Sequence, residues 1–207
     1  MWATSTSSGK IGLNPYHHGD LRAALLARAR TAIEADDAPG LSLRALATAV
    51  GVSPNAPYRH FAGKEDLLAA LSAQGFADLT ARFTPFERTP GVARLEGCMA
   101  GYLQFARDNP GLYRLMFGRD LDPLSCDPVL GDAATACFSA LVALTAGALE
   151  LSADDQHLAK SAAVVWSLSH GAALLEIDKT TSFLAADQRP TATDLARVLI
   201  AGFKIRP

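Results

Sequence analysis

The segment VGVSPNAPYRHFAGK gathers polar and basic side chains within fifteen residues. Tyr58, His60 and Lys64 can each donate a hydrogen bond to a phosphate oxygen. Asn55 and Ala56, which precede them, are small enough to let the start of a helix lie deep in a DNA groove. The chemistry that these residue types can perform is therefore non-covalent contact with a DNA backbone and with base edges.

Two short predicted helices must position these side chains. Ser42 can cap the first helix, and Gly51 suits the left-handed position that ends it. The apolar residues of this helix follow helical spacing: Leu43, Leu46, Ala47 and Val50. Ser53 can cap the second helix, with Pro54 at its first position. Pro57 then removes an early backbone hydrogen bond, which predicts a distorted or 3₁₀-like first turn. Such a helix–turn–helix lays its second helix in the DNA major groove.

Composition sets the wider frame. The 207 residues are 49% hydrophobic, and runs of Val, Ile and Thr are nearly absent, which predicts an all-α protein. A net charge of −2 means that any affinity for DNA depends on local placement and on dimerisation. The three cysteines are an odd count without metal-like spacing, which is typical of buried thiols in a reducing compartment. We find no apolar run of about 18 residues and no signal peptide, so we predict a cytoplasmic protein without a membrane partner.

Pro and Gly divide the chain into further helices. We predict them at residues 20–35, 64–82, 92–108, 110–118, 128–150, 153–178 and 191–204. Asp20 is the predicted cap of the first, and Asp154 and Asp155 are placed in the first turn of the 153–178 helix. The stretch TPFERTPG is interpreted as a linker without helix. The predicted organisation is a disordered segment 1–15, a helix–turn–helix domain 16–63, a connecting helix 64–83 and a helical domain 84–207.

The segments YHHGDLRAALLARA and LSLRALATAVGVSPNAPYRHFAGKEDLLAAL resemble the DNA-binding signature of the TetR family of transcriptional regulators. The resemblance implies a three-helix DNA-binding domain followed by a helical bundle that dimerises and often binds a small effector. It implies phosphate contacts from Ser42, Tyr58, His60 and Lys64, and base contacts from Arg44, Asn55 and Ala56. Ser53 and Pro54 complete the predicted DNA-binding set. Pro57 departs from the family, which more often has a branched aliphatic residue there.

The C-terminal half resembles the TetR subgroup with a Trp-x-x-x-His-Gly pattern, through DNPGLYRLMFG and through Trp166, His170 and Gly171. Trp166 and His170 share one helix face, so they either pack the helix or line an effector pocket. We predict a mostly apolar cavity for a hydrophobic or aromatic effector. Its candidate walls are Tyr102, Phe105, Tyr113, Phe117, Trp166 and His170. Residues 156–178 and 191–204 carry more apolar residues than one buried stripe needs, which predicts the homodimer interface.

Two other classes of function were weighed. A metal-dependent enzyme would need clustered ligands, but no Glu-x-x-His pair, phosphate loop or nucleophile elbow occurs. His17 and His18 are adjacent and point in different directions on a helix, so we interpret them as a helix start or a phosphate contact. A protein-interaction module is the remaining alternative. The sequence predicts no catalytic residue, metal or cofactor, and favours a repressor that binds a palindromic operator as a homodimer and is released by an effector.

Overall fold

The structure is a computed structural model that describes residues 18–35, 40–118 and 127–204. The described residues form eight α-helices and three short 3₁₀ helices, with no strand among them. In chain order these are α1 His18–Glu34, α2 Leu43–Ala49, η1 Ala56–Arg59, α3 Lys64–Ala81, η2 Thr84–Phe86, α4 Gly91–Asp108, α5 Pro110–Phe117, α6 Pro128–Leu149, α7 Leu158–Ile177, η3 Ala186–Gln188 and α8 Ala192–Lys204. The all-α prediction is confirmed.

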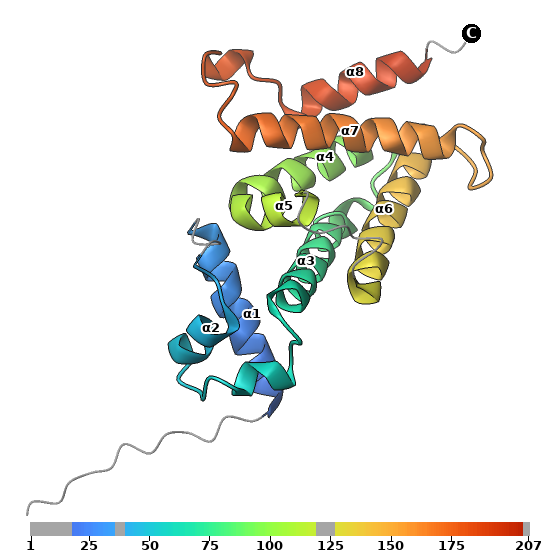
Figure 1. Cartoon of the computed structure of the whole chain (residues 1–207). Coiled ribbons are helices and arrows are strands. Elements are labelled where there is room, and N and C mark those ends of the chain that lie inside the picture. The colour runs from blue at the N-terminus through green and yellow to red at the C-terminus, as the bar shows by residue number, and fades with distance from the viewer. Residues whose placement is uncertain (1–17, 36–39, 119–126, 205–207) are drawn as a thin grey trace, which may run out of the picture.

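The helices form a small module joined to a larger bundle. Figure 1 shows α1, α2 and η1 together at one end, and α3 leading from them toward α4–α8. Helix α3 contacts α1 on the module side and α5 and α6 on the bundle side. Helices α7 and α8 lie at the end of the bundle farthest from η1 (Figure 1). This arrangement separates a surface around η1 from any cavity inside the bundle.

Capping residues explain where several helices begin and end. Ser42 accepts a hydrogen bond from the Ala45 amide at 3.1 Å, as the sequence predicts for the cap of α2. Gly51 has φ +75°, the left-handed conformation expected after that helix. Asp127 caps α6 by accepting from the amides of Val129 and Leu130. These local signals fix the helix boundaries independently of the packing.

Three predicted boundaries are wrong. Helix α1 begins at His18, two residues before the predicted cap Asp20. The linker TPFERTPG contains the short 3₁₀ helix η2, because proline at the start of a helix lacks only an N–H that would have no partner there. Helix α7 begins at Leu158 and not at residue 153, so Asp155 lies in the preceding turn and accepts a hydrogen bond from the His157 amide. The predicted disordered segment 1–15 lies outside the described residues.

The hydrophobic core runs through both parts of the molecule. It includes Leu25 of α1, Leu67 of α3 and Leu112 of α5, all fully buried. The thiols of Cys98 and Cys137 are free and buried, as predicted for small apolar groups, and Cys126 lies outside the described residues.

Helices α6 and α7 are long and apolar enough to cross a membrane by length and composition alone, which the sequence analysis did not expect. This is weak evidence for a membrane span, because core helices of soluble proteins pass the same test. Helix α6 packs against α3, α4 and α7, and helix α7 packs against α4, α6 and α8. This packing buries 28% of the apolar window in α6 and 33% of that in α7, so part of the apolar surface of both helices stays exposed.

Candidate nucleic-acid interface and ligand cavity

The second helix of the predicted helix–turn–helix is the 3₁₀ helix η1, and it begins at Ala56 instead of Pro54. Pro57 lacks the N–H that would bond to the Ser53 carbonyl in an α-helix. The Ala56 amide donates to that carbonyl instead, at 3.0 Å. The predicted side-chain cap from Ser53 is therefore wrong. The 3₁₀-like geometry predicted for the first turn at Pro57 is confirmed, and it extends over all four residues of η1. Pro57 itself is buried, whereas Tyr58 and Arg59 after it are exposed.

The predicted DNA-binding residues lie in one continuous stretch from α2 to the start of α3. Six of them are exposed along the chain: Ser42, Arg44, Ser53, Pro54, Asn55 and Lys64. Tyr58 is also exposed, with 48% of its surface accessible, so its hydroxyl is free to reach a partner outside the chain. Ala56 and His60 are half-buried. Arg59 is exposed in η1 as well, and the sequence analysis missed it although its charge beside Tyr58 was a visible signal.

Two contacts shortly after η1, one buried and one exposed, hold this element against α1 and the start of α3. Phe61, directly after η1, is 1% exposed and lies under the guanidinium of Arg22, 5.3 Å from the ring centroid. The Ala62 amide donates to the Asp66 carboxylate at 2.8 Å. The exposed side chains of η1 therefore project from a backbone that is anchored on both sides.

A cavity of about 350 Å³ lies inside the bundle between α3, α4, α6 and α7. Its walls are mostly aromatic and aliphatic, and consist of Phe76, Leu79, Phe83, Tyr102, Phe117, Ala134, Thr135, Cys137, Phe138, Leu141 and Trp166. The contribution of α3 was not predicted, because the sequence pattern of a helix shows which face is apolar but not which neighbour that face meets. Phe138 and Trp166 stack edge to face at 5.9 Å, and both are 38% exposed, so the cavity opens to the surface beside them.

Three of the six predicted wall residues line this cavity: Tyr102, Phe117 and Trp166. The other three predicted residues are not among its walls. Phe105 and Tyr113 are at most 1% exposed and fill the core. His170 is half-buried and stacks on the Tyr113 ring, with the centroids 5.5 Å apart. Of the two alternatives for His170, packing between helices or lining an effector pocket, the structure shows packing, with the imidazole hydrogen-bonded to Tyr113.

A chain of hydrogen bonds connects the cavity wall to His170. The Tyr113 hydroxyl donates to the Tyr102 hydroxyl at 3.0 Å. It also lies 2.6 Å from His170 Nδ1, and the imidazole tautomer decides which of these two groups donates to the other. Burial lowers the pKa of His170 and raises the pKa of both tyrosines, so all three groups stay neutral at pH 7. Among the described residues that line the cavity, none carries a charged side chain. The cavity thus offers apolar surface with the Tyr102 hydroxyl as its buried polar group.

Comparison with known proteins assigns both halves of the chain. Residues 25–71 match the family described as "Bacterial regulatory proteins, tetR family", and residues 95–200 match "Tetracyclin repressor-like, C-terminal domain". The chain belongs to the TetR family. This is a family of DNA-binding transcriptional regulators and not of enzymes, so the predicted regulator is confirmed at that level.

Solved structures agree with the TetR assignment. A protein with unknown function from Rhodococcus sp. RHA1 is 31% identical, with a TM-score of 0.74, and the match covers 92% of this chain and 97% of that one. A tetR-family transcriptional regulator from Streptomyces coelicolor shares the fold at 21% identity, with a TM-score of 0.70 over 90% of this chain and 82% of its own.

Curated relatives match little more than a third of this TetR chain. The nucleoid occlusion factor SlmA of Pasteurella multocida is 38% identical over 78 residues, which are 37% of this chain and 39% of SlmA. SlmA of Haemophilus influenzae matches to the same extent, over 36% of its length. The chain therefore spans about two fifths of the curated relatives that it matches.

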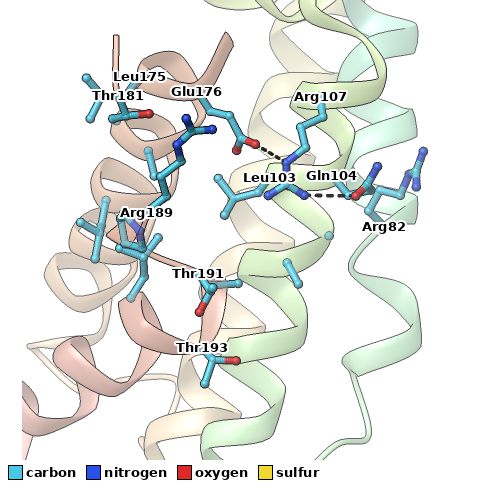
Figure 2. A pocket seen from close by; sticks show the side chains of 18 of the residues that line it. Arg82, Leu103, Gln104, Arg107, Leu175, Glu176, Thr181, Arg189, Thr191 and Thr193 are labelled. Atoms are coloured by element: carbon cyan, nitrogen blue, oxygen red, sulfur yellow. Dashed lines mark hydrogen bonds and ion pairs between the residues drawn. The ribbon is translucent and has the colours of Figure 1, made fainter. Parts of the chain in front are cut away.

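A second, larger hollow of this TetR chain is an open groove of about 1230 Å³ beside α4, α7 and the segment that joins α7 to α8. In Figure 2, Arg107 of α4 pairs with Glu176 of α7 across one end of the groove and also donates to Gln104 of its own helix. Arg189 and Thr191 reach it from the α7–α8 connection (Figure 2). The groove differs from the cavity because it is open and lined by several charged side chains.

Proposed function

We propose that this TetR-family chain is a cytoplasmic transcriptional repressor that binds a palindromic operator as a homodimer and is released by a small, uncharged aromatic effector. The observation that carries the proposal is the pairing, in one chain, of an exposed helix–turn–helix with an uncharged aromatic cavity at a distance from it. Repression, the operator and the effector go beyond family membership.

The DNA contacts follow from charge and exposure around η1. Arg44 donates, and Asn55 donates and accepts, the hydrogen bonds that read base edges; Arg44 is exposed near the start of α2, and Asn55 is exposed directly before η1. Ala56 adds apolar contact. The phosphate contacts are assigned to Ser42, Tyr58, His60 and Lys64, and we add Arg59 because its guanidinium is exposed in the same element.

The homodimer is assigned to α7 and α8, because both leave large apolar side chains exposed. Val164 and Leu175 of α7 are 47% and 50% exposed, and Val198 of α8 is 69% exposed. The open groove borders the same face, so we assign it to the dimer surface and not to the effector. A two-fold dimer built on these helices would present two η1 elements to successive major grooves, about 34–36 Å apart.

The effector class follows from the walls of the cavity. A volume of about 350 Å³ suits a compound of one or two rings, at the small end of ligand pockets. An ionised ligand is disfavoured, because no lining side chain would compensate for its lost hydration. One hydroxyl or carbonyl can pair with Tyr102. Trp166, His170 and Gly171 are proposed to place the chain in the Trp-x-x-x-His-Gly subgroup, where the histidine supports Tyr102 through Tyr113.

In vitro selection from random duplex DNA with the full-length chain tests this proposal. We expect recovery of an inverted repeat, and we expect 2-naphthol, a neutral two-ring phenol, to quench Trp166 fluorescence and weaken binding to the recovered duplex. Failure to enrich any duplex would refute the DNA-binding assignment and leave the protein-interaction alternative. Enrichment without a naphthol response, repeated across neutral one- and two-ring compounds, would refute the effector class alone.

A further inference from the structure

The end of α1 is joined to the start of α5 by one carboxylate. Glu34, the last residue of α1, accepts hydrogen bonds from the amides of Gly111 and Leu112 at 2.9 and 3.0 Å. These amides belong to the first turn of α5, where backbone N–H groups have no partner within the helix and favour negative charge. We name this pair of hydrogen bonds the Glu34 clasp. It connects the module that carries η1 to the bundle that holds the cavity.

The backbones approach closely at the same point. A Cβ atom added to Gly111 would lie 2.4 Å from the Ile33 carbonyl oxygen, so only glycine allows α5 to sit this near α1. Arg30, one turn before Glu34, donates to Asn109 Oδ1 and pairs with Asp78 of α3, both at 2.7 Å. The motif DNPGLYRLMFG thus supplies its asparagine and its glycine to this junction.

The other end of α5 reaches the cavity. Phe117, the last residue of α5, is a wall of the cavity and packs edge to face on Phe76 of α3 at 5.4 Å. The same ring packs on His170 at 4.7 Å and on Trp166 at 6.4 Å. Eight helical residues span about 12 Å and do not bend over that length. A displacement of Phe117 therefore moves the whole of α5.

We propose that α5 transmits the effect of an occupied cavity to the DNA-binding module, and that the Glu34 clasp is the contact through which α5 acts on that module. An occupant that shifts Phe117 pushes α5, and α5 then either carries α1 with it or breaks the clasp. Either outcome reorients η1, which is anchored to α1 through Phe61 and Arg22. The inference rests on the proposed function, because it names the route by which the cavity controls DNA binding.

The clasp competes with a second connection. Helix α3 runs from the module into the bundle, and its polar cross-link to α1 is the Arg30–Asp78 ion pair, which lies beside apolar packing between the two helices. The side chains of this pair are 32% and 47% exposed, and ion pairs in water-accessible positions contribute little. The Glu34 bonds are partly buried and end on backbone amides of a short helix. We therefore assign the larger share of the coupling to α5.

A double-mutant cycle tests, without a known effector, whether the Glu34 clasp couples the cavity to DNA binding. Ala134 lines the cavity from α6, so Ala134→Phe fills part of it from within. In the wild-type background we expect Ala134→Phe to weaken binding to the selected duplex by about tenfold, within the usual range of coupling between sites. In a Glu34→Ala background we expect the same filling to weaken binding by less than about threefold. Ala136→Phe, exposed on α6 and away from the cavity walls, is the control for filling.

Two further variants keep the test decisive if Glu34→Ala fails to fold. Glu34→Gln retains one acceptor oxygen and should give an intermediate loss of coupling, and Glu87→Ala, at an exposed glutamate of the same chain, should leave the coupling unchanged. Circular dichroism and sedimentation check fold and dimer for each variant. The inference would be overturned if Ala134→Phe weakened DNA binding equally in the wild-type, Glu34→Ala and Glu34→Gln backgrounds. The proposed function would then still stand. No effect in any background would show that the cavity does not control DNA binding, and would overturn both.

Discussion

Tyr113→Phe should destabilise the protein more than Tyr102→Phe, although both changes remove one hydroxyl from the same hydrogen-bonded chain. The Tyr113 hydroxyl contacts two partners, His170 Nδ1 at 2.6 Å and the Tyr102 hydroxyl at 3.0 Å. The Tyr102 hydroxyl lies 3.4 Å from His170, which is a long contact, so its main partner is Tyr113. Removing the Tyr113 hydroxyl therefore breaks both hydrogen bonds, whereas removing the Tyr102 hydroxyl leaves the shorter bond between Tyr113 and His170 intact.

The magnitudes follow from the number of bonds lost. A hydrogen bond contributes about 0.5–1.5 kcal/mol net, and a buried group left without its partner adds to the loss. Tyr113→Phe loses two bonds at a fully buried site, so we expect about 2 kcal/mol, which in a chain of this size lowers Tm by about 4–8 °C. Tyr102→Phe should cost about 1 kcal/mol and lower Tm by about 2–4 °C.

Urea and thermal unfolding of both single variants and of the double variant measure these differences. The double variant should cost less than the sum of the singles, because they share one bond. Tyr58→Phe, at an exposed tyrosine, is the control and should stay within about 0.5 kcal/mol of wild type. If Tyr102→Phe proved the more damaging change, or if the two effects were additive, the hydrogen-bonded chain would not be the arrangement in solution.

Four further predictions concern DNA binding, assembly and pH. Lys64→Ala should weaken binding to all DNA sequences alike and reduce the slope of log K against log salt by roughly one per protomer, and an unchanged slope would exclude its phosphate contact. Asn55→Ala should relax preference at one position of each operator half-site in a repeated selection, whereas loss of affinity without any change in preference would argue against base contact. Val198→Asp should yield monomers in sedimentation at micromolar concentration, while Val129→Asp, equally exposed on α6, should remain dimeric; dimers in both cases would move the interface away from α8. Burial lowers the pKa of His170 below its usual 6.5, so the unfolded chain binds that proton more readily. The stability that neutral His170 contributes is complete above pH 6.5 and declines as the pH falls below it, and His170→Phe should therefore flatten the change in Tm between pH 7.5 and 5.5.

The sequence predicted the local structure well because local signals are strong in this chain. Ser42 and Gly51 bound α2 through capping chemistry that involves only neighbouring residues. The break at Asn109 and the 3₁₀ character around Pro57 follow in the same way from the geometry of proline. Where the predictions failed, as at Ser53 or Asp155, a competing local bond took the place of the expected one.

The interior was beyond the reach of the sequence pattern. The sequence pattern places Tyr102, Tyr113 and His170 alike on apolar helix faces. Only the packing of the helices decides that Tyr102 lines the cavity and that Tyr113 and His170 do not. Phe76 of α3 and Phe83, which follows that helix, were not predicted as cavity walls, since helical periodicity gives the direction of a side chain and not its neighbour.

The sequence by itself therefore determined the helices, their caps, the helix–turn–helix and the family resemblance, because each depends on residues close together in the chain. The tertiary structure decided the cavity walls, the neutral chain from Tyr102 to His170 and the Glu34 clasp. Glu34 and Gly111 are 77 positions apart, and nothing in the spacing of either residue marks the other as its partner. Their contact exists because the core brings the end of α1 against the start of α5, where unpaired amides meet a carboxylate.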